Sequence, residues 1–311
     1  MFHEQHSPPE GFTIGICASD SASQLPALLS FIRAENFGPD FVLERVIAVA
    51  SGCPESVTSK LKELASSDQR FRTVVESERN GKARAINKII ECSAGKYLVM
   101  LNADAFPEVG AIRQLLTMEA SDVRIGCASA WPVFEDGDGL LQRALWLMWS
   151  AHSLMSLQLN HAGISNHACD ELLVVRRSLI KKVPANLVND GAYIGGLVHA
   201  QGYLVKFSTT ARVKIEVPTR LSDLIRQRQR IIFGHVQVWR KLGHPPKTIE
   251  SMLFMKPFFS VRTLVRLLSG RPRLIMALPV VVASELISTF MASIDAIRFP
   301  EKHAVWKRTA R

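Results

Sequence analysis

In the first third of the chain, apolar runs of strand length alternate with segments whose apolar residues have helical spacing. Short apolar runs of strand length occupy residues 12–18, 45–51, 71–77 and 96–103. The segments between these runs carry apolar residues at helical spacing, over residues 24–37, 57–65 and 81–94. Strands that alternate with helices in this way predict right-handed βαβ units. We therefore expect an α/β fold with a mostly parallel sheet flanked by helices.

Small and polar residues stand where the predicted strands end. Ala18 and Ser51 close the first two runs, and the fourth leads into Asn102 and Asp104. Open parallel sheets bind ligands at the carboxyl ends of their strands. We therefore expect these residues to share one site.

The second half of the chain has longer apolar segments. Residues 139–160 form a strongly apolar helical stretch, which favours a core or domain-edge helix over an acceptor or membrane surface. A strand entering a helix is expected at residues 171–180. Two further strands are expected at residues 202–209 and 211–217.

The last third is both basic and apolar. Residues 253–268 interleave aromatic and aliphatic side chains with basic ones, as an interfacial amphipathic helix does. Residues 274–294 carry a single charge, Glu285, over a length that can span a bilayer. A buried helical hairpin of a soluble oligomer is the alternative. The predicted organisation is a disordered lead-in, a globular domain and a membrane-associating helical extension, at residues 1–11, 12–245 and 246–311.

Composition narrows the partners and the compartment. The chain has 311 residues, 47% of them hydrophobic, and 38 basic against 28 acidic residues give a net charge of +10. Such a surplus suits nucleic acid, nucleotide phosphates or an anionic membrane. Five cysteines without any CxxC pair indicate reduced thiols in a cytosolic compartment. The polar, Pro-rich first residues predict a chain without a signal peptide.

Four segments carry candidate chemistry, and each has a structural alternative. Asp104 beside Asn102 can tether a hard divalent cation, or the loop is an ordinary turn. Gly81 and Lys82 at a helix start favour phosphate, or they open a helix with a solvated basic face. The other two segments are an Asn189–Asp190 pair, which is either a general base or a helix cap, and an Arg-Gln run at residues 226–230, which is either a phosphate clamp or a solvated face.

Taken in order, these segments resemble the inverting family-2 glycosyltransferases of the GT-A (Rossmann-like) fold, of the membrane-associated bacterial and archaeal type. The resemblance covers residues 12–242. It rests on the "GK" helix start, the acidic-loop triplet "NAD", the pair "ND" and the run "QRQR".

The resemblance implies roles for individual residues. Asp104 matches the metal ligand of the family's acidic loop, with Mg²⁺ or Mn²⁺ as the cofactor, and Asp190 matches the catalytic base. Asn102, Asn189 and Ile231 depart from the family's pattern of Asp, acid and Trp. The residues expected to bind the nucleotide-sugar donor are Ala18, Ser51, Lys82, Asn102, Asp104, Gln227 and Arg230, and those expected on the acceptor side are Asp170 and Glu171.

The leading hypothesis is an inverting, metal-dependent glycosyltransferase acting on a lipid-linked or saccharide acceptor at the cytoplasmic face of the plasma membrane. A catalytically silent GT-A domain that binds a nucleotide or a partner at the membrane is the alternative. A nucleotidyltransferase would need a Gly-rich basic loop after the first strand, which is absent from the sequence there. A nucleic-acid binder is disfavoured because aromatic residues do not interleave with the arginines.

Overall fold

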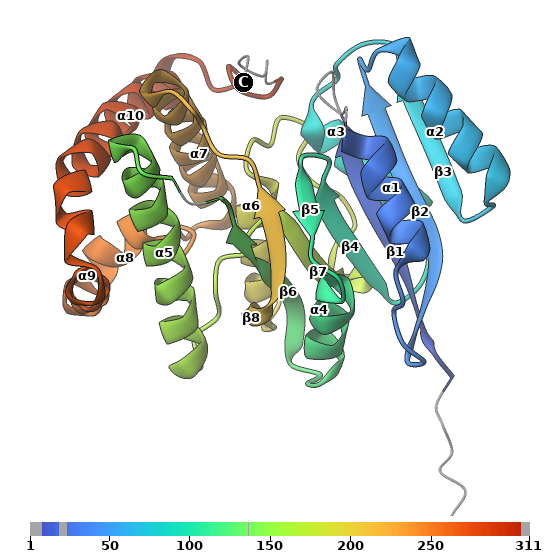
Figure 1. The fold of residues 1–311 in the computed structure, drawn as a ribbon, viewed down its shortest axis with the longest axis horizontal. Helices are drawn as coiled ribbons and strands as arrows, with labels where there is room; N and C mark the ends of the chain where they lie inside the picture. The colour runs from blue at the N-terminus through green and yellow to red at the C-terminus, as the bar shows by residue number, and fades with distance from the viewer. Residues whose placement is uncertain (1–7, 19–23, 136, 306–311) are drawn as a thin grey trace, which may run out of the picture.

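The structure is a computed structural model that describes residues 8–18, 24–135 and 137–305. An eight-stranded sheet in the order β3-β2-β1-β4-β7-β6-β8-β5 forms its centre, with helices on both faces (Figure 1). The strands are β1 Glu10–Ala18, β2 Phe41–Ser51, β3 Phe71–Glu76, β4 Tyr97–Asn102, β5 Ala105–Pro107, β6 Ile125–Val133, β7 Leu172–Arg176 and β8 Leu204–Ile215.

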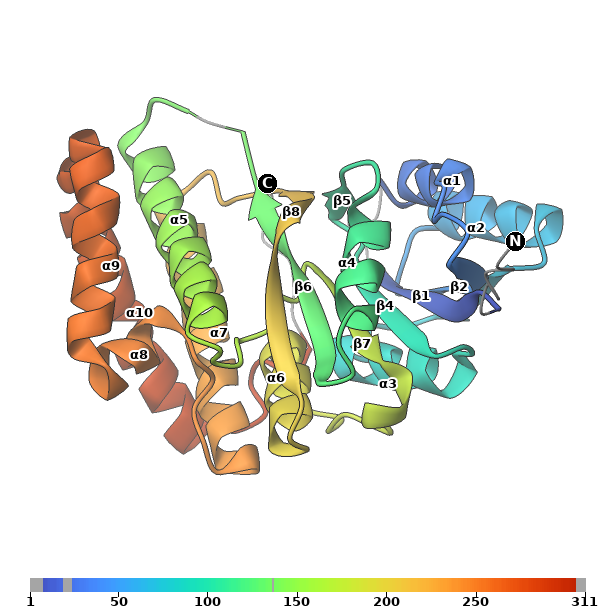
Figure 2. The same cartoon turned by 90° about the horizontal axis from the view of Figure 1, so that it is seen from below.

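The helices fall into two groups along the sheet. The group nearer the N-terminus comprises α1 Leu25–Ala34, α2 Glu55–Ser67, α3 Lys82–Cys92, α4 Ala111–Ala120 and α6 Asp190–Ala200. The second group stands at the end of the molecule opposite α1 and α2, as both views show (Figures 1 and 2). It comprises α5 Leu140–His161, α7 Leu221–Leu242, α8 Ile249–Met255, α9 Pro257–Gly270, the 3₁₀ turn η3 Pro272–Ala277 and α10 Leu278–Arg298.

The sheet is mixed, and its N-terminal half is parallel. β3, β2, β1 and β4 pair in parallel, as the alternating strand and helix pattern predicts. β7 runs antiparallel to both β4 and β6, and β5 runs antiparallel to β8. β6 and β8 pair in parallel. The predicted α/β fold is confirmed, and the antiparallel strands bring the segment before β7 to the same edge as the end of β4.

Alternate residues of the central strands build a core on each face of the sheet. Phe12, Ile14 and Ile16 of β1 point into one cluster, together with apolar residues of α1, α2 and α4. Leu98 and Met100 of β4 belong to the cluster on the other face, which contains residues of α3 and α6. Successive side chains of a strand point to opposite faces, so these strands are apolar on both sides. The core thereby holds the carboxyl ends of β1, β2 and β4 in fixed positions.

Several elements differ from the sequence prediction. β8 is one continuous strand where two were expected, and β7 is followed by a 3₁₀ turn, η2 Arg177–Leu179, instead of a helix. The predicted interfacial helix over 253–268 is two helices, because Pro257 lacks a backbone N–H and starts α9 at its first position. β1 begins at Glu10, inside the expected lead-in.

The apolar C-terminal helix packs against the rest of the chain. Within the part of the chain that the structure describes, Pro272–Arg298 is the single helical stretch long and apolar enough to cross a membrane. Ala292 and Ala296 of α10 pack with Phe233 of α7, and Ser288 Oγ donates a 3.0 Å hydrogen bond to the carbonyl oxygen of Ile225. One face of α10 is therefore docked on α7.

Candidate functional site

A cavity of about 630 Å³ opens at the carboxyl ends of the parallel strands and continues between α5, α7 and α10. The residues expected at the site from the sequence, Asp190 excepted, line it. They are Ala18, Ser51, Lys82, Asn102, Asp104, Asp170, Glu171, Gln227 and Arg230. Asp190 is 4% exposed and lies against the wall formed by Lys82.

Strand register explains why distant residues meet at this edge. Ala18 pairs with Ala50, next to Ser51, and Cys17 pairs with Asn102. The hydroxyl of Ser51 donates to the carboxylate of Glu76 at the end of β3. The ends of the four parallel strands thus lie side by side at one edge of the sheet.

Lys82 connects two carboxylates at the centre of the cavity. Gly81 precedes it with a φ of 89°, a conformation that favours glycine, and Lys82 is the first residue of α3. Its Nζ lies 2.8 Å from Oδ1 of Asp190 and 3.2 Å from Oδ2 of Asp170. The start of α3 therefore supplies both free backbone N–H groups and a cation.

The three charges shift one another's protonation equilibria. Burial alone would lower the pKa of Lys82, but Asp190 and Asp170 outweigh it and raise that pKa above its ordinary value. Burial raises the pKa of Asp190, against the attraction of Lys82. Burial acts in the same direction on Asp170, but Lys82 and Arg230 outweigh it and lower the pKa of that carboxyl. Asp190 is therefore the more basic of the two carboxylates.

Asn189 performs the capping role at the start of α6. Its Oδ1 accepts a 3.0 Å hydrogen bond from the backbone N–H of Ala192, so the side chain of Asp190 is left for Lys82. Two glycines allow this turn to be approached closely. A Cβ on Gly191 would lie 2.7 Å from Cβ of Asp170, and one on Gly234 would lie 2.7 Å from Cβ of Asn189.

Asn102 and Glu171 form a polar pair beside Asp104. Nδ2 of Asn102 donates a 2.9 Å hydrogen bond to Oε2 of Glu171. Burial raises the pKa of Glu171 to about 8, and the negative charges of Asp170 and Asp104 add to the effect. Asp170 and Glu171 were expected on the acceptor side, and their hydrogen bonds go to Lys82 and Asn102, which were expected on the donor side.

The oxygen atoms at this edge fit a hard divalent cation. Asp104 and Glu171 are carboxylates close enough to repel each other's charge, and both line the cavity. Among the described residues, no three His, Cys, Asp or Glu side chains form a group that could hold a metal ion. A cation here would need further oxygen ligands from a bound molecule.

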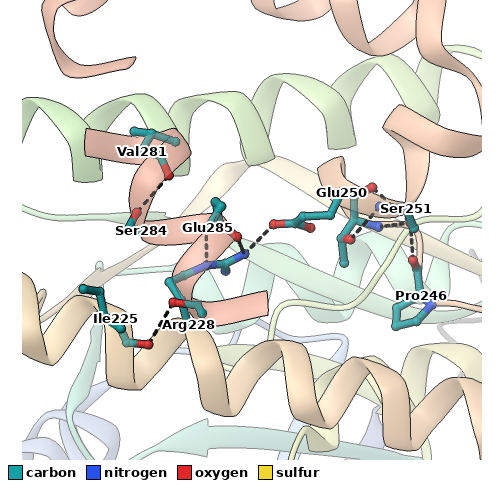
Figure 3. Close-up of polar contacts among 10 residues, drawn as sticks. Ile225, Arg228, Pro246, Glu250, Ser251, Val281, Ser284 and Glu285 are labelled. Carbon is teal, nitrogen blue, oxygen red and sulfur yellow. Dashed lines mark hydrogen bonds and ion pairs between the residues drawn. The ribbon is translucent and has the colours of Figure 1, made fainter. Parts of the chain in front are cut away.

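Arg228 joins α7 to the C-terminal helices α8 and α10 (Figure 3). Its Nε lies 2.6 Å from Oε1 of Glu285 on α10, and its Nη2 lies 3.1 Å from Oε2 of the same carboxylate. Nη2 also donates to Glu250 of α8. The sequence run around Gln227 gave no sign that Arg228 pairs with carboxylates instead of facing solvent or phosphate.

The sequence did not point to two other parts of the cavity wall. Residues after α10 turn back over the start of α3, where the carbonyl oxygen of Ala304 lies 2.6 Å from the position of a Cβ built on Gly81. The imidazoles of His152, His167 and His235 also line the cavity. They come from α5, from the segment before β7 and from α7, and no spacing rule connects them.

Comparison with solved structures identifies the same fold in proteins of low sequence identity. The mannosyltransferase PcManGT from Pyrobaculum calidifontis, in complex with GDP-Man and Mn²⁺, superposes with a TM-score of 0.65 at 17% identity. The match covers 94% of this chain and 88% of that one. TarS of S. aureus gives a TM-score of 0.50 at 11% identity, over 74% of this chain and 40% of that one. The shared architecture is the GT-A fold.

Sequence comparison gives relatives of known name and a family. The poly-β-1,6-N-acetyl-D-glucosamine synthase of Staphylococcus aureus (strain COL) is 20% identical over 255 residues, which are 81% of this chain. The match spans 57% of the length of that synthase. The family model of glycosyl transferase family 2 matches residues 13–183, more than half of the chain. The chain belongs to glycosyl transferase family 2.

Proposed function

We propose that this chain is an inverting glycosyltransferase that moves a sugar from a nucleotide-sugar to a hydroxyl of a lipid-linked or saccharide acceptor. The observation that carries the proposal is the Asp190–Lys82–Asp170 group. It stands where the strand ends meet the part of the cavity between α5 and α7. A base and a phosphate-binding cation are thereby adjacent, as a single displacement at the anomeric carbon requires.

Asp104 would hold a divalent cation, Mg²⁺ or Mn²⁺, with Glu171 as a second carboxylate. The carboxylate pair and the Mn²⁺ bound to the structurally similar mannosyltransferase support this assignment. When bound, the cation neutralises the charge of the leaving diphosphate. The amide of Asn102 keeps Glu171 oriented toward the loop.

Lys82, the backbone N–H groups at the start of α3, Gln227 and Arg230 would bind the diphosphate. Ser51 and Ala18 would border the nucleoside at the ends of β1 and β2. Donors that point at a developing charge stabilise it most when they are fixed in advance. The closed core under these strands provides that rigidity.

Asp190 would remove the proton from the acceptor hydroxyl as that oxygen attacks the anomeric carbon from the face opposite the leaving group. One displacement inverts the configuration. Lys82 covers Asp190 in the structure. When Lys82 turns to the donor phosphates, Asp190 loses a neutralising partner and becomes a stronger base, because a nearby cation lowers a carboxyl pKa.

The C-terminal helices would place the enzyme on a membrane, at its cytoplasmic face. Phe254 and Phe258 are 87% and 91% exposed, and Leu286 and Phe290 of α10 are 67% and 68% exposed. Basic residues in the segment from α8 to η3 are exposed as well. They are Lys256, Arg262, Arg266, Arg271 and Arg273. We call these exposed phenylalanines, Leu286 and the five basic residues the apolar-basic surface, and its composition matches an anionic lipid interface.

A catalytically silent GT-A domain is the second candidate. Asn102 and Ile231 stand where the family has an acid and an aromatic residue, and Ala304 covers Gly81 at the expected phosphate site. A domain that binds a nucleotide or a partner without turnover would tolerate these features. Asn189 does not favour this candidate, because its amide caps α6.

The deciding experiment measures binding and turnover of UDP- and GDP-sugars by the wild type, Asp190→Asn and Asp170→Asn, with Mn²⁺ and membranes present. Asp190→Asn should bind donor as the wild type does and lose about 10²–10⁴-fold in transfer, the usual contribution of a general base. Asp170→Asn should lose less. Absence of donor binding by the wild type would remove the transferase proposal, and binding without turnover would favour the silent domain.

A further inference from the structure

Three imidazole rings stand in a row along the cavity wall beyond the catalytic group. The ring centroids of His152 and His167 are 5.7 Å apart, and those of His167 and His235 are also 5.7 Å apart. Trp149 lies one helical turn before His152 on α5, with its ring 6.0 Å away and nearly perpendicular. We call these four residues the histidine row. All of them line the cavity.

The ring nitrogens of the row have unused hydrogen-bonding capacity. Nε2 of His152, both ring nitrogens of His167 and Nε2 of His235 are buried and have no hydrogen-bond partner among the described residues. Buried polar atoms in folded proteins are nearly always hydrogen-bonded, to protein, water or ligand. Four such atoms, in residues that line one cavity, therefore indicate a place for a polar molecule.

The imidazoles are neutral at physiological pH. Burial lowers the pKa of His152 to about 3 and that of His167 and His235 to about 4. A neutral imidazole has one N–H donor and one acceptor nitrogen. A sugar hydroxyl likewise donates one hydrogen bond and accepts others, and an aromatic side chain such as Trp149 offers an apolar face beside them.

The surroundings disfavour an anion in the same place. The guanidinium of Arg228 is already paired with Glu285 and Glu250. Asp170 and Glu250 both act electrostatically on His152 and His235, and each is paired with a cation, Lys82 or Arg228. A phosphate only accepts hydrogen bonds, so it would leave the acceptor nitrogen of each neutral imidazole without a partner.

The row begins beside the Asp190–Lys82–Asp170 group, since Asp170 acts electrostatically on all three imidazoles. Gly234 allows α7 to approach Asn189, where a Cβ would lie 2.7 Å from the Cβ of Asn189. His235 follows Gly234 directly, and Asn189 directly precedes Asp190. His167 is three residues before Asp170 in the segment leading into β7. A molecule seated on the row therefore has one end next to Asp170 and Lys82, which holds Asp190, and the other toward α5.

We propose that the histidine row is the subsite for the sugar ring of a neutral saccharide acceptor, which presents one hydroxyl to Asp190. The proposal rests on the proposed function and names the acceptor class for it. Apolar residues of α9 and α10 line the same cavity, so the cavity can accept either a free saccharide or one attached to a lipid. They are Leu264, Leu278, Val281, Val282 and Leu286.

Saturation-transfer NMR without donor tests the subsite directly. The probes are the methyl glycosides of glucose, mannose, galactose and N-acetylglucosamine, with wild type, His152→Phe, His152→Gln and His161→Phe. His152→Phe keeps the ring packing against Trp149 and removes the nitrogens. His152→Gln restores a neutral donor and acceptor, and His161 is an exposed histidine of the same helix. Thermal unfolding checks that each variant is folded.

At least one glycoside should give a signal with the wild type, His152→Gln and His161→Phe, and that signal should fall about tenfold in His152→Phe, the loss expected for one hydrogen bond. Equal signals in wild type and His152→Phe would overturn the proposal. So would the absence of any signal from all four glycosides with the wild type.

Turnover assays then distinguish a free sugar acceptor from a lipid-attached one. They also distinguish failure of the subsite from failure of the proposed transferase function. Each methyl glycoside, its octyl glycoside in detergent micelles and farnesyl phosphate are offered with a donor that the enzyme hydrolyses. Transfer to a glycoside with a KM about tenfold higher in His152→Phe supports the subsite, and a preference for the octyl form identifies a lipid-borne sugar. Transfer to farnesyl phosphate alone, with donor still bound and hydrolysed, would overturn the subsite and leave the proposed function intact.

Discussion

The side-chain amide of Asn102 donates a 2.9 Å hydrogen bond to Oε2 of Glu171, across the antiparallel pair of β4 and β7. The backbone N–H of Asn102 also donates to the carbonyl oxygen of Glu171, at 3.1 Å. An amide at the end of β4 thus faces the carboxyl group of the residue directly before β7. Glu171 thus places a carboxyl group beside position 102, where the side chain is an amide. Burial raises the pKa of that carboxyl to about 8, so it loses its proton when a cation binds.

We predict that metal binding depends on the carboxylate of Glu171. We also predict that an acid at position 102 can replace the acid at position 171. Glu171→Gln should weaken Mn²⁺ binding in the presence of UDP or GDP by about tenfold or more, because the cation loses one of two carboxylates. The double variant Asn102→Asp/Glu171→Gln should recover most of that affinity. Electron paramagnetic resonance of free Mn²⁺ measures both without any turnover.

The matched control for the exchange is Glu108→Gln, which removes an exposed carboxylate from the loop after β5. It should bind Mn²⁺ as the wild type does. Asp104→Asn should lose more affinity than Glu171→Gln. Unchanged Mn²⁺ binding in Glu171→Gln would show that Asp104 and the diphosphate suffice.

We predict that the Arg228–Glu285 pair stabilises the docking of α10 on α7. Arg228 is 14% exposed and Glu285 is 21% exposed at the side chain, so removing Glu285 leaves a largely buried guanidinium that keeps its contact with Glu250 but loses two hydrogen bonds. Glu285→Leu should lower the free energy of unfolding by about 2–3 kcal/mol. Arg228→Leu/Glu285→Leu should not recover this loss, because Glu250 then loses Arg228 as its partner.

Denaturant unfolding of the two variants and of Glu301→Gln, an exposed carboxylate beyond α10, measures the effect. Glu301→Gln should unfold as the wild type does. Equal stabilities of wild type and Glu285→Leu would contradict a structural role for the pair.

We predict that the histidine row makes the protein lose stability in acid. The three pKa values are about 3 to 4 in the folded state, against about 6.5 for an unperturbed histidine. Between these values the unfolded chain binds protons that the folded chain does not. Stability is therefore full above pH ~6.5 and falls as the pH drops toward ~4. Thermal unfolding between pH 4 and 7 should show a shallower pH slope in His152→Phe than in the wild type, with His161→Phe unchanged.

The sequence is informative about the strand ends because local periodicity places them. Ala18, Ser51 and Asn102 each close an apolar run, and parallel strands bring such ends to one edge. The partner of Asn102 is not predictable in this way, since the antiparallel pairing of β4 with β7 is a long-range contact. Asn189 read as a lost acid, whereas in the folded chain its amide caps α6.

The histidine row was even harder to predict from the sequence, because it too depends on long-range contacts. Each member has ordinary neighbours in the sequence, and α5 reads as a core helix. The row exists because the glycine at 234 lets α7 approach the turn at Asn189, and because β7 brings His167 to the same wall. Packing between elements creates it, and no local pattern records packing.

We predict that the apolar-basic surface binds anionic membranes. Phe254→Ser/Phe258→Ser should weaken binding to phosphatidylcholine vesicles containing phosphatidylglycerol by about tenfold or more, because two exposed aromatic rings no longer enter the interface. Arg262→Ser/Arg266→Ser should weaken binding mainly at low salt, by about 1 kcal/mol per arginine.

Val109→Ser/Val123→Ser removes two exposed apolar side chains from loops beside α4 and is the matched control. Point variants are preferable to truncation, because removing α10 would uncover the face of α7 that Ala292 and Ala296 cover. Co-sedimentation with sucrose-loaded vesicles measures each variant. Equal binding of the phenylalanine variant and the control would contradict a role for this surface.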